Sequence, residues 1–398
     1  MSEYFKILLY LMRNHDNHNI EKIDSIIRNF DSDDIKKVKQ ISVSQGVWTL
    51  VYPELEKYID TSEYLTEFMQ AVTIGIQRTT FQLHMIDELN NAGFKVCLLK
   101  GAAVAALYPH PEYRISGDTD ILIKPEEETE IIKFLEQNGY TVEQREKNDH
   151  HFKAYHPVGG LLEGHVRLYS IPTEKIILDG LELYNEEFSE MKIEGYIVPV
   201  LGLNDGLMYL TAHYIKHLVN EGGGIRQMLD LLIYMEHYKN ELDFERYYSV
   251  MKQLRYYKLI EVVQTIGAKY WGFDYPIKYE DLAEEILTDS EEGGIFGFDT
   301  DSRRGFYRIY CKKRSENSLK SKALLAVKNE AGLKNRFFPS QSILLRNGEY
   351  KYAKNKILLP IAWTHRLFRA VMKRTVKNEK YDGVEKRLKL MRELNMID

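Results

Sequence analysis

The chain has 398 residues, 44% of them hydrophobic and 28% charged, and a formal net charge of −5. This length predicts about two or three domains, and the hydrophobic content is enough for real cores, which excludes a disordered protein. Its cysteines, Cys97 and Cys311, are too few for a disulfide framework or a cysteine-rich zinc site and suit a reducing cytosol. The first residues lack a signal-peptide pattern, and no apolar run reaches the roughly 20 residues that span a bilayer. We therefore expect a cytoplasmic protein without a transmembrane segment.

The apolar pattern changes its period along the chain. Residues up to about Gly93 have helical spacing, and 64–91 is a long run without proline, so this part is predicted to be helical. A mixture of strands and helices follows. Strands are predicted over 95–99, 119–123, 139–142, 151–156 and 161–169, and a helix over 126–138. Helices return over 204–220, 225–238 and onward to Tyr270, and the acidic segment 289–300 is predicted to be a loop.

This pattern divides the chain into four regions. Residues 1–93 form an N-terminal helical region, 94–200 an α/β or α+β core, 201–300 a helical domain and 301–398 a basic C-terminal region. From 303 to 398 there are 25 Lys and Arg but 8 Asp and Glu, a net charge of +17. This segment either docks on the acidic remainder, which we prefer, or binds a polyanion or a membrane surface. No aromatic-rich motif supports single-stranded nucleic acid as a substrate.

Asp118 and Asp120 are the first candidates for a functional site. They lie one residue apart on a predicted strand, so their carboxylates point to the same face. Such a pair needs a cation between its members, and a hard divalent ion such as Mg²⁺ prefers oxygen ligands. An exposed acidic turn is the alternative, but the apolar run Ile121–Ile123 places the pair at a strand end, where sites are commonly built. The pattern predicts metal-dependent chemistry on a phosphorylated substrate.

A third carboxylate belongs to Glu163, which shares one face of a predicted strand with His165. If this strand lies beside the Asp118–Asp120 strand, Glu163 completes a cluster that can hold one or two Mg²⁺ ions and activate an attacking hydroxyl. A solvent-facing strand residue is the alternative.

A strand-to-helix turn precedes the aspartates at Lys100-Gly101. Glycine there lets backbone amides approach a phosphate. Arg114 could bind a triphosphate through its guanidinium group, or it is a surface loop arginine.

These motifs resemble a known family. The pattern L-L-K-G, Leu107-Tyr108-Pro109, Tyr113-Arg114 and G-D-T-D-I-L-I is similar to the bacterial uncharacterised nucleotidyltransferase family, within the DNA polymerase β-like nucleotidyltransferase superfamily. Further matching residues are Gly139-Tyr140, His150-His151, Glu163-Gly164-His165, His213, His217, Arg226 and Asp230. In place of the superfamily's Gly-Ser or Gly-Gly turn, this chain has Lys100-Gly101-Ala102, which offers no serine hydroxyl at the turn.

The resemblance implies an α+β fold, in which a polymerase β-like core of a small mixed sheet with helices is flanked by N- and C-terminal helical regions. It also implies transfer of a nucleoside monophosphate from an NTP such as ATP to a hydroxyl acceptor, with release of pyrophosphate and with Mg²⁺ or Mn²⁺ as cofactor. Asp118, Asp120 and Glu163 would be the catalytic and metal-binding residues, and Lys100, Gly101 and Arg114 would bind the nucleotide.

Histidines are candidates for the acceptor pocket. His213 and His217 lie one helical turn apart, so they either pack between helices or line this pocket together with His151 and His165. Arg226 and Asp230, with the same spacing, predict an ion pair.

Three hypotheses about function follow from the sequence. The first is a nucleotidyltransferase acting on a small alcohol, a sugar, a peptide or a protein hydroxyl. The second is a catalytically degenerate member of the fold that acts as a binding or scaffold protein. The third is a polyanion- or membrane-surface binder that uses the basic C-terminal region.

Overall fold

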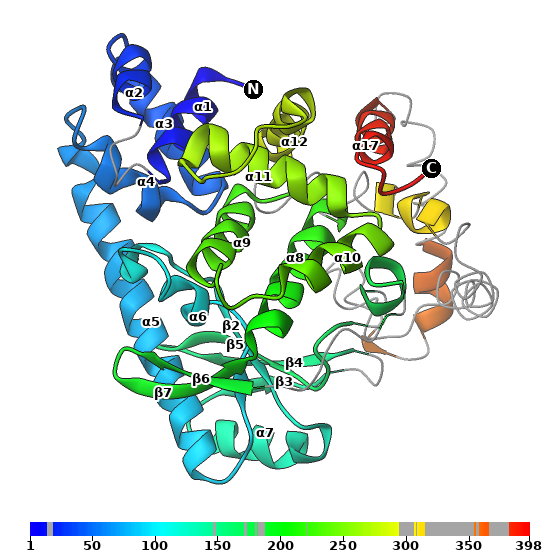
Figure 1. The fold of residues 1–398 in the computed structure, drawn as a ribbon. Coiled ribbons are helices and arrows are strands. Elements are labelled where there is room, and N and C mark those ends of the chain that lie inside the picture. Colours follow the sequence, from blue (N-terminus) through cyan, green and yellow to red (C-terminus); the bar gives the residue numbers. More distant parts are fainter. Residues whose placement is uncertain are drawn as a thin grey trace. The chain divides into compact units, whose positions relative to one another are not determined.

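The computed structural model describes most of the chain (Figure 1). The described residues are 1–13, 19–145, 149–170, 173–179, 181, 188–220, 222–293, 306–307, 309–314, 354–355, 358–365 and 382–398. Met1–Asp299 and Glu393–Met396 form one compact unit, and Thr300–Arg392 and Ile397–Asp398 form a second.

The first part of the chain is helical, as predicted. Its helices are α1 (Glu3–Leu11), α2 (Ile20–Ile27), α3 (Ser32–Ser44), α4 (Trp48–Leu55), the 3-10 turn η1 (Ser62–Tyr64) and the long α5 (Leu65–Asn91). Two starts are capped by side chains: Ser2 accepts a hydrogen bond from the amide of Phe5, and Asp31 forms a capping box with Asp34. Gly93 follows α5 with a φ of +94°, the left-handed conformation that ends many helices.

A seven-stranded mixed sheet is the centre of this unit. Its order is β3-β4-β5-β2-β1-β7-β6, with β2 parallel to β5 and β1 parallel to β7. The strands are β1 (Cys97–Leu98), β2 (Asp118–Leu122), β3 (Thr141–Glu143), β4 (His151–His156), β5 (Gly160–His165), β6 (Phe188–Ile193) and β7 (Tyr196–Leu201). The β6–β7 hairpin was absent from the prediction, and β5 ends at His165 rather than continuing to residue 169. The mixed α/β architecture agrees with the predicted fold class.

The two faces of the sheet differ in chemistry. Ile121, Leu162 and Phe152 belong to a buried apolar cluster, together with residues of α5 and of α7 (Glu128–Gln137). In Figure 1 α7 lies below the sheet, α5 runs from the upper left down past the sheet to its lower side, and the later helices lie above it. Because side chains alternate along a strand, Asp120 and Glu163 point to the face opposite this core. The fold therefore places the carboxylates between the sheet and the helices above it.

Five helices follow the sheet in the chain: α8 (Leu203–Asn220), α9 (Ile225–His237), α10 (Phe244–Gln253), α11 (Tyr257–Trp271) and α12 (Glu280–Gly293). The predicted loop over 289–300 is thus wrong at its start, because residues 289–293 continue α12. Leu282, Ile286 and Asp289 are buried at helical spacing, and this packing outweighs the acidic, glycine-containing composition from which the loop was inferred.

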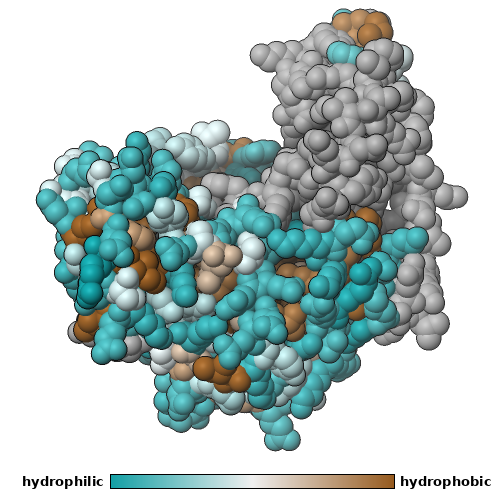
Figure 2. Space-filling model, turned by 90° about the horizontal axis from the view of Figure 1, so that it is seen from above, coloured by the Kyte–Doolittle hydropathy of each residue, from teal (hydrophilic) through white to brown (hydrophobic). Residues whose placement is uncertain are grey.

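The second unit is described only in part. It contains α17 (Asp382–Glu393), whereas most of the predicted basic C-terminal region lies outside the described residues. Among the helices that the structure describes, none combines the length and the hydropathy needed to cross a membrane. On the face shown in Figure 2, hydrophobic residues form small patches separated by hydrophilic side chains.

Candidate active site

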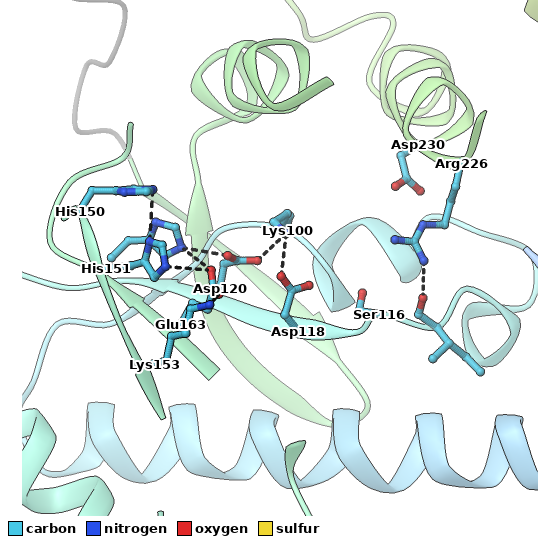
Figure 3. Close-up of polar contacts among 12 residues, drawn as sticks. Lys100, Ser116, Asp118, Asp120, His150, His151, Lys153, Glu163, Arg226 and Asp230 are labelled. Carbon is cyan, nitrogen blue, oxygen red and sulfur yellow. Dashed lines mark hydrogen bonds and ion pairs between the residues drawn. The ribbon is translucent and has the colours of Figure 1, made fainter. Parts of the chain in front are cut away.

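The register of two parallel strands brings the carboxylates together. Asp120 on β2 lies directly beside Glu163 on β5, and Asp118 shares the face of Asp120 two residues earlier. Ligand atoms of Asp120, Glu163 and His165 all lie within 4.8 Å of one another. The neighbouring-strand arrangement on which the predicted cluster depended is therefore present (Figure 3).

Gly164 lies between Glu163 and His165 on β5 and faces the opposite, buried side of the strand. A Cβ atom at this position would lie 2.2 Å from the Phe152 ring of β4, so only glycine leaves room for that ring. Phe152 is fully buried and belongs to the apolar cluster below the sheet. The Glu-Gly-His pattern therefore joins two candidate site residues to one core contact.

Lys100 lies against both aspartates. Its Nζ is 2.7 Å from Oδ2 of Asp120 and 3.5 Å from Oδ2 of Asp118. Burial alone lowers the pKa of Lys100, but the two carboxylates outweigh burial and raise it. Burial likewise opposes ionisation of Asp120, yet Lys100 and His165 hold the pKa of that carboxyl well below its usual range. Lys100 is thus charged and Asp120 ionised at neutral pH.

A serine hydroxyl does lie beside the Lys100-Gly101 turn, although the turn itself contains none. Gly101 precedes the short helix α6 (Ala102–Ala105) with a φ of +68°, which a residue with a side chain rarely adopts. A Cβ atom there would lie 3.3 Å from Oγ of Ser116. Sequence reasoning missed Ser116 because the fold, not the spacing, brings it to the turn.

Arg114 lies in a buried cluster of polar side chains and is not among the residues that line the cavity beside the carboxylates. Its Nε donates a hydrogen bond to Oδ1 of Asp230 at 3.1 Å, and its other nitrogens contact Oδ2 of Asp230 and the hydroxyl of Ser116. The Tyr108 hydroxyl also donates to Oδ1 of Asp230, at 2.8 Å. The predicted Arg226–Asp230 ion pair is therefore wrong, since Asp230 pairs with Arg114 and Arg226 donates to the carbonyl of Ile115 at 2.8 Å.

The carboxylates face a cavity of about 170 Å³ between the sheet and α8. Its walls are formed by Lys100, Asp118, Asp120, His150, His151, Glu163, His165, Leu168, Tyr169, Ser170, Thr173, Tyr209, Ala212, His213, Lys216 and His217. All four histidines predicted for the acceptor pocket line it, and the ring centroids of His213 and His217 are 4.5 Å apart. Lys216 was missed, although its spacing of three from His213 places it near the same helix face.

The histidines on the sheet contact one another and the carboxylates. Nε2 of His165 lies 2.9 Å from Oδ1 of Asp120, and Nε2 of His151 lies 3.7 Å from Oε2 of Glu163. Burial, together with the neighbouring His165 and His151, lowers the pKa of His150 to about 3. Burial and Lys100 lower the pKa of His213 well below its ordinary value. His150 and His213 are therefore neutral at pH 7.

Comparison with known proteins identifies the class. A model of the uncharacterised nucleotidyltransferase family matches residues 31–266, a range that contains the whole carboxylate site, and the chain belongs to this family. The family resemblance read from the motifs and the assignment as a nucleotidyltransferase enzyme are thereby confirmed. A search of curated proteins finds no match.

Two solved structures are similar at low identity. One is the lincosamide antibiotic adenylyltransferase LnuA in a lincomycin-bound form, with 18% identity over 38% of this chain and 92% of its own, at a TM-score of 0.28. The other is an antigenic nucleotidyltransferase-like protein from Paracoccidioides brasiliensis, with 16% identity over 40% of this chain and 76% of its own, at a TM-score of 0.29.

Proposed function

We propose that the chain is a cytoplasmic enzyme that transfers a nucleoside monophosphate from an NTP to a hydroxyl acceptor, with release of pyrophosphate. The observation that carries this proposal is the pairing of Asp120 with Glu163 on adjacent strands, with Asp118 on the same face, at one wall of a cavity. Membership of the nucleotidyltransferase family supports the same reaction class.

The donor atoms of this cluster fit Mg²⁺. Asp118, Asp120 and Glu163 offer carboxylate oxygens, the ligands that Mg²⁺ and Mn²⁺ prefer. Among the described residues, the ammonium groups within ion-pair distance of these three carboxylates are those of Lys100 and the half-exposed Lys153. The cluster therefore retains negative charge that a divalent cation would neutralise. When bound there, Mg²⁺ would supply positive charge to the reacting phosphate and lower the pKa of the acceptor hydroxyl.

Each side chain then has a defined task. Glu163 accepts the proton of the acceptor hydroxyl, or serves as a metal ligand if another base does so. Lys100, already held at the aspartates, lies where its ammonium can pair with the phosphates of the NTP, beside the Gly101 backbone. Arg114 supports nucleotide binding indirectly. Its guanidinium group contacts Ser116 and Asp230 and so holds the segment that leads into β2 in place.

The acceptor would occupy the cavity between the sheet and α8. The four histidines 151, 165, 213 and 217 and the hydroxyl of Tyr209 can hydrogen-bond a hydroxyl-bearing molecule, whether a small alcohol, a sugar, a peptide or a protein side chain.

The first test is calorimetric titration of ATP, GTP, CTP and UTP, each with Mg²⁺, into the wild-type chain and into the Asp118→Asn/Asp120→Asn double variant. We expect one nucleotide to bind only with Mg²⁺ and only to the wild type. That nucleotide, labelled at its α-phosphate, is then incubated with an acceptor panel while pyrophosphate is measured. Equal binding to both proteins would contradict the assignment of the site.

A binding protein without catalytic activity is the second candidate, and the position of Lys100 favours it. An ammonium group at 2.7 Å from Asp120 already neutralises part of the charge that would attract a metal. This hypothesis predicts nucleotide binding without product for every acceptor. The polyanion-binding hypothesis rests on residues 303–398, which lie largely outside the described residues, and stays a prediction.

A further inference from the structure

We propose that His150, His151 and His165 form a metal site of their own, beside the carboxylates, that binds a divalent transition metal of the Zn²⁺ class. Each of the three histidines offers a ring nitrogen, and these atoms all lie within 4.8 Å of one another. Nε2 of His150 and Nδ1 of His151 are 3.3 Å apart. Around a tetrahedral ion with bonds of about 2.1 Å, neighbouring ligand atoms are separated by roughly 3.4 Å. This pair of nitrogens already has the spacing of two ligands.

His165 is prepared as the third ligand by Asp120. Its Nε2 lies 2.9 Å from Oδ1 of Asp120, and since a carboxylate oxygen accepts hydrogen bonds, Nε2 is the donor and Nδ1 is the nitrogen left for a metal. His165 is 4% exposed, and its Nδ1 is buried without a hydrogen-bond partner in the part of the chain that the structure describes. A buried, unpartnered nitrogen is unfavourable, and a metal ion would satisfy it. A carboxylate that orients a ligating imidazole is the usual support of such a site.

The donor set distinguishes this site from the carboxylate cluster. Imidazole nitrogens suit Zn²⁺, Cu²⁺ and Ni²⁺, whereas Mg²⁺ prefers oxygen. Glu163 lies between the two sites, with Oε2 at 3.7 Å from Nε2 of His151 and at 3.9 Å from Nε2 of His165. The fourth coordination position is therefore open to Glu163 or to a molecule in the cavity. Asp120 contacts His165 through Oδ1 and Lys100 through Oδ2, so it belongs to both sites.

The alternative is that the three rings pack against one another and that the 3.3 Å contact between His150 and His151 is a hydrogen bond. The centroids of His150 and His151 both lie 5.2 Å from that of His165, which is ordinary contact between rings. This alternative predicts no metal affinity beyond that of scattered surface histidines.

The test uses the full chain without an affinity tag, stripped with a chelator, desalted and titrated with Co²⁺ in excess Mg²⁺, which occupies the oxygen sites. We expect one Co²⁺ per chain, with the strong visible absorption of tetrahedral cobalt, and displacement of this Co²⁺ by Zn²⁺. The His150→Asn/His151→Asn variant should bind Co²⁺ at least about 100-fold more weakly, since even loss of a supporting contact costs roughly 10- to 100-fold. His110→Asn is the control, because that side chain is 61% exposed and lies outside the cavity.

Equal Co²⁺ affinity in the wild type and in the double variant would overturn the proposal. If the double variant does not fold, X-ray absorption of the zinc-loaded wild type decides instead: three imidazole ligands are expected, and fewer than two refute the site. The proposal does not depend on the nucleotidyltransferase mechanism. Asp118→Asn should abolish transfer but leave Co²⁺ binding unchanged, so the two proposals fail separately.

Discussion

Two clusters of buried charged side chains lie near the segment that leads into β2. Both combine acidic and basic groups, but in different proportions. In the carboxylate cluster (Lys100, Asp118, Asp120 and Glu163), one buried ammonium faces acidic groups that border a cavity, and the side chain of Asp118 is 36% exposed. In the arginine cluster (Tyr108, Arg114, Arg226 and Asp230), the side chains of Arg114 and Asp230 are only 5% and 6% exposed.

The difference lies in what remains unsatisfied. Both oxygens of Asp230 are bound, by Arg114 and by the Tyr108 hydroxyl. Arg226 donates to the carbonyl of Ile115 through one terminal nitrogen, while its Nε is buried without a hydrogen-bond partner among the described residues. The acidic group of this cluster is therefore neutralised, and the contacts hold α9 against the segment 114–116. The carboxylate cluster has more acidic groups than ammonium groups and an opening to solvent, so it can take up a cation. Ionisable groups with uncompensated charge beside a cavity are candidates for a functional site, and the carboxylate cluster meets both conditions.

The largest expected effect is on catalysis at the carboxylate cluster. Asp120→Asn keeps the shape of the side chain but removes its charge, and the several kcal/mol of metal-assisted stabilisation at stake correspond to a loss of about 1,000-fold or more in kcat/KM. Pyrophosphate release measures this loss. Asp118→Asn, at a more exposed position, should show the same loss with an unchanged melting temperature.

The matched control is Glu190→Gln, a carboxylate exposed on β6 of the same sheet, which should keep full activity. If Asp118→Asn and Asp120→Asn are both as active as Glu190→Gln, the carboxylate cluster is structural and the contrast with the arginine cluster disappears.

The next largest effect is on stability at the arginine cluster. Arg114→Ala leaves Asp230 buried without its cation, so the free energy of unfolding should fall by about 3–5 kcal/mol in urea denaturation. Arg145→Ala removes an ion pair of similar geometry with Glu128, at 2.8 Å, but near the surface. That control should lose no more than about 1 kcal/mol. Equal losses in the two variants would show that burial does not determine how much Arg114 contributes to the free energy of unfolding.

The comparison also explains how much could be predicted from the sequence. The carboxylate cluster depends on period-two alternation, so the shared face of Asp118 and Asp120 and that of Glu163 and His165 followed from the residues alone. The arginine cluster depends on a contact between residues 114 and 230, which no local rule reaches. The i,i+4 rule instead suggested Arg226–Asp230, because it counts only neighbours on one helix.

The β6–β7 hairpin was missed for a different, local reason. Most of β6 is exposed, and β7 contains Pro199, a residue that argues against a strand in the interior of a sheet. The structure tolerates it because β7 pairs with β1 only around Leu98 and Val200. Ser116 was missed as a site residue because tertiary packing, not spacing, brings it to the turn. His150 and Lys216 also line the cavity, although their positions next to His151 and three residues from His213 could have suggested them.

A smaller effect is expected at Lys100, whose ammonium group compensates the charge of Asp120 and also lines the cavity. Lys100→Met leaves Asp120 with less compensation, so the unfolding free energy should fall by about 1–3 kcal/mol in the presence of a chelator. Added Mg²⁺ should restore more stability to this variant than to the wild type, because removal of the competing ammonium strengthens Mg²⁺ binding and tighter binding to the folded state stabilises it more. Thermal denaturation with chelator and with Mg²⁺ measures both. Lys153→Met, at a half-exposed lysine 3.6 Å from Glu163, is the control and should show no such rescue.

The smallest effect is a pH dependence at His213, on the opposite wall of the cavity. Burial and the nearby Lys100 lower the pKa of His213 well below its ordinary value of 6.5, so below pH 6.5 the unfolded chain takes up a proton that the folded chain refuses. The unfolding free energy therefore falls as the pH decreases from 7. The slope is at most about 1.4 kcal/mol per pH unit, which corresponds to one proton taken up on unfolding. His213→Asn removes this contribution and should flatten the curve from urea denaturation between pH 7 and pH 5. An unchanged slope would mean that the negative charge of the carboxylate cluster offsets the effect of Lys100 on the pKa of His213. The electrostatic field of the cluster would then extend across the cavity to α8.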